Sequence, residues 1–161
     1  MKNLIIPFLF LFALVTSCKK EPEVVIEEKT PLELFTNNSS KSWRLKEGIA
    51  KQNGLEVNII ASQNPCITDN LIKLYSDFSY EFTEGVTKCD PNNPDLILKA
   101  EWSLGSEGKS ITIDKFIFLS YSVDNPTFYL SEITETTFTG TTNLTIQEEN
   151  VDLDVVFEAV P

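Results

Sequence analysis

Histidine is absent from all 161 residues of this chain. The absence excludes histidine general bases, serine–histidine–aspartate and cysteine–histidine nucleophiles, and zinc sites that need an imidazole ligand. The numerous Asp and Glu residues allow a carboxylate pair for glycoside hydrolysis, but no pair stands in a sequence context that singles it out. We therefore expect no enzyme activity, no catalytic residue and no cofactor.

Basic residues are also few: 13 Lys and Arg stand against 24 Asp and Glu, for a net charge of −11. A surface of this sign repels nucleic-acid phosphates and anionic lipid headgroups. Nucleic acid is therefore not an expected partner. An acidic surface is also compatible with a secreted domain whose function does not depend on its charge.

Long apolar runs are limited to one, the twelve residues from Leu4 to Val15. A helix of this length spans about 18 Å, which is too short for the ~30 Å hydrocarbon core of a bilayer. The run follows Lys2 and precedes small residues, which is the organisation of a secretory signal peptide. An ordinary signal with an incidental cysteine, or a buried helix, is the alternative interpretation.

Cysteine is scarce, and one of the three cysteines, Cys18, lies just after the apolar run. The stretch Val15-Thr16-Ser17-Cys18 resembles the bacterial lipoprotein signal, the lipobox. This resemblance implies cleavage before Cys18 and lipidation of its thiol, so that acyl chains anchor the protein to a membrane. Lys19 follows instead of Asp, unlike the inner-membrane retention signal, and the expected location is the outer membrane, with its side left open.

Cys66 and Cys89 remain as an even pair if Cys18 carries lipid. In an exported protein such a pair predicts a disulfide, which would stabilise the fold by restricting the unfolded chain. Free buried thiols are one alternative. A redox or metal-binding pair is another, although the spacing is not that of a C-x-x-C motif.

The chain divides into a signal peptide (1–17), a lipid anchor with a charged tether (18–30) and one folded domain (31–161). The domain should begin with a short helix. Thr30 is a suitable N-cap, Pro31 suits the first helical position, and Glu33 lies in the first turn.

From Ser42 onward, apolar and polar residues alternate, which indicates half-buried β-strands. The clearest example is the stretch 96–104. Similar alternation recurs at residues 43–46, 55–59, 80–83, 111–114, 128–130, 138–142 and 151–159. Residues 115–120 are apolar on both faces, which indicates a strand covered on both sides or a bend. About eight or nine such strands must bury one face against one another, as a sandwich or a closed barrel.

The order of several short motifs resembles that of the lipocalin-like lipoprotein domains of Bacteroidetes-type bacteria. These motifs are Ser42-Trp43-Arg44-Leu45, Cys66-Ile67-Thr68-Asp69-Asn70, Tyr80-Glu81-Phe82 before Cys89, Glu101-Trp102-Ser103-Leu104, Ser110-Ile111-Thr112-Ile113 and Ile133-Thr134-Glu135-Thr136-Thr137-Phe138. The resemblance implies that residues 31–161 form an all-β domain, a single antiparallel up-and-down barrel of about eight strands with a short N-terminal helix. It implies no reaction, because a fold does not fix a function.

The inward positions of such a barrel are rich in aromatic residues. The predicted interior, and candidate ligand-binding, residues are Trp43, Tyr80, Phe82, Trp102, Phe128, Phe138 and Phe157. An eight-stranded barrel has room for side chains or for one small ligand, so these rings either fill a core or line an apolar cavity. If the rings line a cavity, the Tyr80 hydroxyl and the indole N–H groups would be available to hydrogen-bond the ligand.

The sequence therefore predicts a lipid-anchored cell-envelope protein that binds a small apolar ligand in its barrel. The alternative is a filled barrel whose surface docks an envelope protein or a glycan. The loop Asp90–Asp95 carries oxygen ligands but lacks the spacing and the glycine of a Ca²⁺ loop. We expect a plain turn there and no metal site.

Overall fold

The structure, a computed structural model, describes residues 28–161. The predicted signal peptide (1–17), Cys18 and most of the predicted tether lie outside the described residues. Within residues 28–161, no helix combines the length and the apolar character needed to cross a bilayer.

The short helix α1 (Pro31–Thr36) forms where the sequence predicts it. Thr30 and Glu33 make a capping box: the Thr30 hydroxyl accepts from the Glu33 N–H (3.3 Å), and the Glu33 carboxylate accepts from the Thr30 N–H (2.7 Å). The hydrogen bonds that the Thr30 N–H and hydroxyl donate to this carboxylate lower the pKa of the Glu33 carboxyl. Asn37 ends the helix in the left-handed conformation, with φ of 50°.

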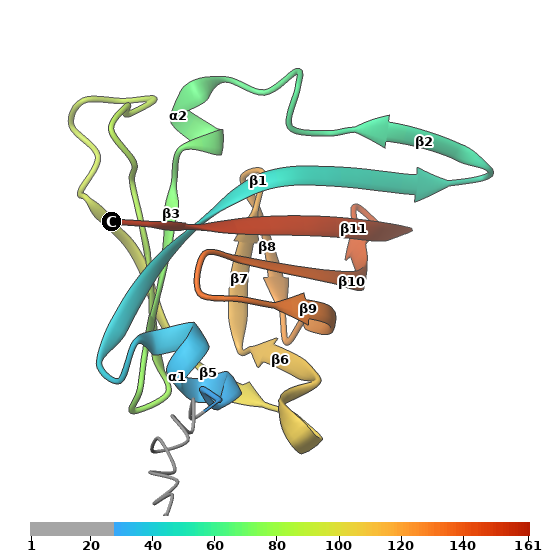
Figure 1. Cartoon of the computed structure of the whole chain (residues 1–161). Coiled ribbons are helices and arrows are strands. Elements are labelled where there is room, and N and C mark those ends of the chain that lie inside the picture. The colour runs from blue at the N-terminus through green and yellow to red at the C-terminus, as the bar shows by residue number, and fades with distance from the viewer. Residues whose placement is uncertain (1–27) are drawn as a thin grey trace, which may run out of the picture.

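The rest of the described chain is mostly β-structure (Figure 1). Its strands are β1 (Ser40–Gln52), β2 (Leu55–Asn58), β3 (Leu71–Tyr75), β4 (Ser79–Thr83), β5 (Leu96–Leu104), β6 (Ser110–Ile113), β7 (Lys115–Phe118), β8 (Tyr121–Asp124), β9 (Thr127–Ile133), β10 (Thr137–Ile146) and β11 (Glu149–Val160). A second short helix, α2 (Pro65–Thr68), and a 3₁₀ turn, η1 (Ser106–Gly108), lie between strands.

Eight of the strands form a closed antiparallel barrel in the order β1-β3-β4-β5-β6-β9-β10-β11. The ring closes because β1 pairs with β3 on one side and with β11, the last strand of this order, on the other. Trp43 of β1 lies opposite Ile72 of β3 and opposite Ala159 of β11. Closure leaves none of these strands as a free edge. The predicted fold class, an all-β up-and-down barrel of about eight strands, is confirmed.

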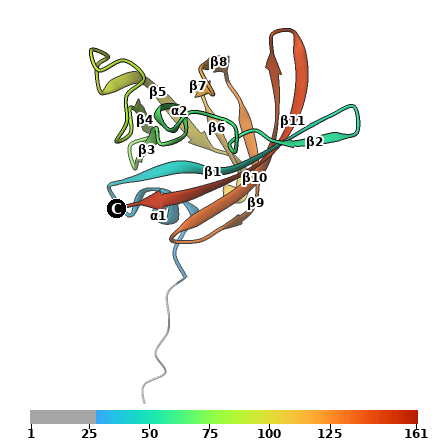
Figure 2. The same ribbon diagram turned by 90° about the horizontal axis from the view of Figure 1, so that it is seen from above.

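Two hairpins extend this ring. The strand β2 pairs only with the end of β1, and the β1–β2 hairpin projects beyond the barrel (Figure 2). The sequence predicts half-buried Leu55 and Val57, but these side chains are 70% and 55% exposed, and this prediction is wrong. No second layer of the described fold covers β2, so its alternation does not lead to burial.

The other hairpin, β7–β8, lies between β6 and β9 in the sequence and forms its own two-stranded sheet, while β6 and β9 pair directly with each other. It contains the segment 115–120, which is apolar on both faces. Phe116 and Phe118 are buried, and Ile117 between them is half-buried. The strand β7 is thus buried on its phenylalanine face and only partly covered on the other, and the chain leaves the barrel sheet here, so the structure combines elements of both predicted alternatives.

Aromatic rings fill much of the barrel and connect it to α1. The Phe35 ring of α1 packs edge-on against Trp43, Trp102 and Phe138, with centroid distances of 6.0, 5.9 and 5.2 Å. Phe138 in turn stacks on Phe157 at 4.5 Å. Such ring pairs add to the free energy gained from burying the rings. The helix α1 therefore closes its end of the barrel with a packed core.

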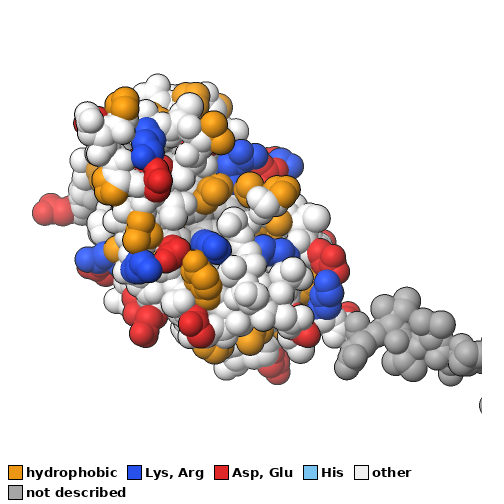
Figure 3. All heavy atoms as spheres, turned by 90° about the vertical axis from the view of Figure 1, so that its left-hand side faces the viewer, with side chains coloured by type: hydrophobic (Ala, Val, Ile, Leu, Met, Phe, Trp, Pro, Cys, Tyr) orange, Lys and Arg blue, Asp and Glu red, His pale blue; other side chains and the backbone are white. Residues whose placement is uncertain are grey.

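On the outer surface, acidic, basic and apolar side chains are intermixed over the face that Figure 3 shows. Ion pairs tie neighbouring strands together there and elsewhere, as between Lys99 of β5 and Glu81 of β4 at 2.7 Å. The hydrogen bond from Lys99 lowers the pKa of the Glu81 carboxyl. Because Lys99 is largely exposed, this pair contributes little to stability.

Candidate ligand-binding site

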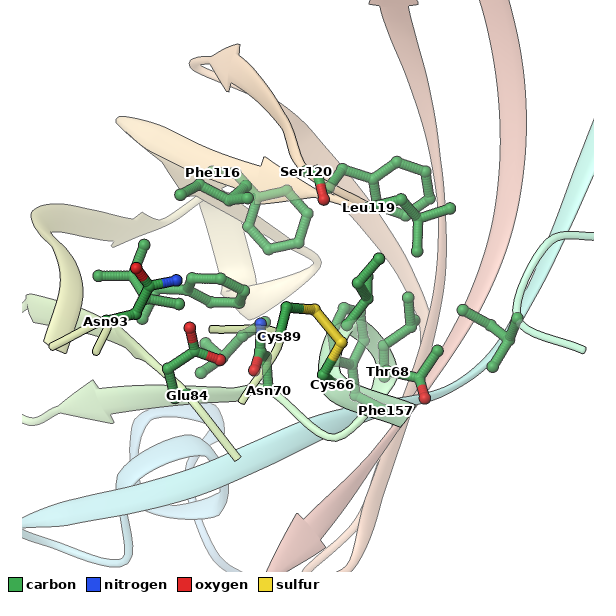
Figure 4. A pocket seen from close by; sticks show the side chains of 18 residues that line it. Cys66, Thr68, Asn70, Glu84, Cys89, Asn93, Phe116, Leu119, Ser120 and Phe157 are labelled. Carbon is green, nitrogen blue, oxygen red and sulfur yellow. A yellow bond between two sulfur atoms is a disulfide. The ribbon is translucent and has the colours of Figure 1, made fainter. Parts of the chain in front are cut away.

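A cavity of about 310 Å³ lies beneath α2, bounded by the loop after β4 and by the β7–β8 hairpin (Figure 4). Its apolar lining includes Leu45, Ile72, Phe82, Phe116, Phe118 and Phe157. Its polar lining is formed by Thr68, Asn70, Glu84, Asn93 and Ser120. The volume is at the lower end of the range for small-molecule sites, roughly 300–1,000 Å³. The helices α1 and α2 lie at opposite ends of the molecule (Figure 1).

All seven predicted interior aromatic residues are buried, with exposed fractions of 7% or less. The structure places Phe82 and Phe157 in the wall of the cavity. The remaining five belong to the packed core and are not among the residues that line this cavity: Trp43, Tyr80, Trp102, Phe128 and Phe138. The barrel is thus filled in one part and hollow in another, and a ligand-binding role for these residues stays a prediction.

The sequence predicts that the indole N–H groups are available to hydrogen-bond a ligand. This prediction is wrong, because both groups donate to backbone carbonyls. Trp43 Nε1 donates to the carbonyl of Phe35 (3.0 Å), and Trp102 Nε1 donates to the carbonyl of Tyr75 (3.1 Å). Buried donors take such partners because an unpaired polar group costs free energy. The Tyr80 hydroxyl has no hydrogen-bond partner among the described residues, and burial raises its pKa.

The predicted bridge between Cys66 and Cys89 is present and forms part of the cavity wall. It joins α2 to the loop between β4 and β5. No residue of α2 is fully buried, and its N-cap Asn64 makes no side-chain hydrogen bond. The helix is attached to the loop after β4 by the bridge and by the hydrogen bonds from Thr87 to its C-cap, Asp69. The helix α2 was not expected from the sequence, although Pro65 after Asn64 suits a helix start.

The polar side of the cavity is organised by Asn70, just before β3, and by residues just after β4. Asn70 Oδ1 accepts from the Gly85 N–H (3.1 Å), and the Glu84 N–H donates to the Asp95 carbonyl (2.8 Å). These bonds hold the backbone of Glu84 in place beside the cavity. Its Oε2 atom is buried and has no hydrogen-bond partner among the described residues. Nothing in the sequence distinguishes Glu84 from the many other carboxylates.

The β7–β8 hairpin covers the cavity from the opposite side (Figure 4). Its two-residue turn places Leu119 and Ser120 at φ of 47° and 76°, a left-handed conformation that suits Gly or Asn far better than Leu. Phe116 anchors the hairpin by packing edge-on against Phe128 at 5.4 Å. The turn is therefore held in a strained conformation by the packing of its own strand.

A second hollow, a surface groove of about 380 Å³, lies on the other side of this turn. It is bounded by the β1–β2 hairpin, β10 and β11, and its lining includes Leu55, Val57 and Tyr121. Phe118 and Leu119 line both hollows, so the β7–β8 turn separates them.

No protein-family model and no curated protein matches the chain. Among solved structures, it is similar to bovine odorant binding protein in complex with a selenium-containing odorant, at 11% identity and a TM-score of 0.46. A structure of bovine odorant binding protein with its natural ligand gives 11% identity and a TM-score of 0.45. The matches cover 88% and 89% of this chain and 78% of the bovine chain. Similarity at this sequence identity and TM-score does not indicate which ligand this chain binds.

Proposed function

We propose that the protein binds one small, mainly apolar molecule in the cavity beside the Cys66–Cys89 bridge. The observation that carries the proposal is the cavity itself, 310 Å³ of space above a floor of Ile72, Phe82 and Phe157 in a closed barrel. At roughly 30 Å³ per water-sized group, this volume accommodates about ten non-hydrogen atoms. Transfer of apolar ligand surface from water into such a site supplies about 25 cal/mol per Å².

We also propose that a lipid on Cys18 anchors this binding domain in the outer membrane of a bacterial cell envelope. The likeness of residues 15–18 to the lipobox supports the anchor. The described fold begins next to α1, at the end away from α2 (Figure 1). A tether entering there would leave the cavity facing away from the membrane, where a ligand can reach it.

The cavity can be tested with octan-1-ol, which has nine non-hydrogen atoms and no charge. We expect the purified protein to bind one molecule in a calorimetric titration. The variant Thr68→Trp, which places an indole in the cavity from α2, should weaken binding by about tenfold or more, since a mismatch of one methylene in an apolar pocket already costs about that factor.

The matched control is Thr141→Trp on the exposed outer side of β10, which should bind octan-1-ol like the parent chain. Absence of binding in the parent chain, or equal binding by both variants, would contradict the proposed site.

The anchor can be tested by cell fractionation. We expect Cys18→Ala to abolish lipid attachment and to leave the chain uncleaved by the lipoprotein peptidase, because the thiol that accepts the lipid is gone. The control Ser17→Ala keeps a small residue before Cys18 and should be processed and retained in the outer-membrane fraction. An unchanged mass and distribution of the Cys18→Ala chain would rule the anchor out.

The second candidate function is docking: the barrel would be filled by side chains, and its surface would bind an envelope partner. The observation in its favour is the apolar groove beside β2, where Leu55 and Val57 are exposed on a strand with one free edge. The octan-1-ol titration separates the two candidates, because docking through β2 needs no occupied cavity.

A further inference from the structure

The cavity has an apolar floor and one carboxylate. Glu84 lines it, and its Oε2 atom is buried without a hydrogen-bond partner among the described residues. Figure 4 shows Glu84 and Asn70 on the side of the cavity away from Phe116 and Leu119. A ligand lying on the phenylalanine floor would therefore have one end beside Glu84.

Within residues 28–161, no basic side chain pairs with this carboxylate. The residues that line the cavity include no Lys or Arg. Lys88, in the same loop, donates to the Asn93 carbonyl (2.8 Å) and pairs with Asp95. The buried Oε2 atom is therefore left without a partner beside an apolar cavity, and a cation from the ligand would supply one.

A second carboxylate strengthens the negative potential at this end. Gly85, the neighbour of Glu84, packs against Asp69 so closely that a Cβ added at Gly85 would lie 2.5 Å from Asp69 Cγ. Asp69 Oδ2 accepts from the Thr87 N–H (2.8 Å), while its Oδ1 is buried and unpartnered among the described residues. Glu84 thus lines the polar end of the cavity and Asp69 lies behind it, outside the lining, and the negative charges of both favour a cation there.

We propose that the ligand is a small apolar amine, whose ammonium group binds Glu84 while its hydrocarbon part packs between Phe116 and the floor residues Phe82 and Phe157. The proposal rests on the proposed function, because it specifies the ligand class of the same cavity. A protonated amine donates charge-assisted hydrogen bonds to Oε2, which are stronger than those of a neutral hydroxyl. A carboxylic acid of the same length is rejected, because its charge repels Glu84.

Three eight-carbon probes with different headgroups test this. We expect octylamine to bind the purified protein about tenfold or more tightly than octan-1-ol, and octanoate to bind more weakly than either. The near-isosteric variant Glu84→Gln should lose this preference, so that the ratio of octylamine affinity to octan-1-ol affinity falls to about one. Glu84→Asp retains the charge and should retain part of the amine preference.

The matched control is Glu101→Gln, which removes one negative charge from an exposed position on β5 and should keep the full preference for octylamine. Equal affinities of octylamine and octan-1-ol for the parent chain would overturn the amine proposal and leave the cavity as a binding site. An amine preference that persists in Glu84→Gln would also overturn it, since general attraction to an acidic protein would then explain the result. Failure of all three probes to bind would contradict the proposed function itself.

Discussion

Replacement of Trp43 by alanine should lower the free energy of unfolding by about 4 kcal/mol, the largest single-residue effect that we expect. Trp43 is fully buried, and its ring packs edge-on against Phe35 and Phe138 at 6.0 and 5.0 Å. Its Nε1 also donates to the buried carbonyl of Phe35, which would be left without that donor. Loss of this side chain opens a void at the point where β1 joins β3 and β11.

Urea unfolding of the purified protein, followed by circular dichroism, measures this loss. The variant Trp43→Phe keeps an aromatic ring without the hydrogen bond, and its loss should be smaller. The surface control is Tyr129→Ala, because Tyr129 is 64% exposed and its removal should change stability by about 0.5 kcal/mol at most. If Trp43→Ala were no more destabilising than Tyr129→Ala, the packed core at α1 would be wrong. A loss of about 4 kcal/mol is a large share of the ~5–15 kcal/mol of a typical domain.

The double variant Cys66→Ala/Cys89→Ala should lose roughly 3 kcal/mol of stability, the second large effect. The bridge joins residues 23 apart in the sequence, and a closed loop of that length restricts the unfolded chain by about this amount. The loss should extend to ligand binding. With no fully buried residue of its own, α2 is held by the bridge together with the hydrogen bonds from Thr87 to Asp69, and Thr68 of α2 and Asn93 of the bridged loop both line the cavity.

Unfolding and octan-1-ol titration, each with and without a thiol reductant, test this prediction. In the parent chain, reduction should lower stability and weaken octan-1-ol binding as the double substitution does. In the double variant, the reductant should change neither quantity, which controls for other effects of the reagent. A parent chain whose binding is the same in both redox states would show that the bridge does not support the cavity wall.

Much of the fold follows from local sequence patterns. Thr30, Pro31 and Glu33 predict α1, because capping depends on residues within one turn of each other. The alternation along 96–104 and 151–159 predicts barrel strands, and the inward aromatic residues are all buried. The pairing of Cys66 with Cys89 follows once the N-terminal cysteine is set apart.

The candidate site is less predictable, because it is formed by contacts between residues far apart in the chain. The partner of the Trp102 indole is the carbonyl of Tyr75, a residue that no periodicity connects to it. Glu84 is one of many carboxylates until β4 places it beside the α2 bridge. Leu55 and Val57 alternate like barrel residues, yet they lie on a strand that nothing in the described fold covers.

The amino-acid sequence by itself determined the short capped helix, the strands, the inward-facing rings and the disulfide, because each depends on side chains that are near neighbours or on the chemistry of one residue type. Only the tertiary structure decided which end of the barrel is filled and which is hollow, and which polar groups are left without partners. The physical reason is that alternation specifies which face of a strand avoids water. The volume enclosed by those faces depends on how β1, β11 and the β7–β8 hairpin come together in space.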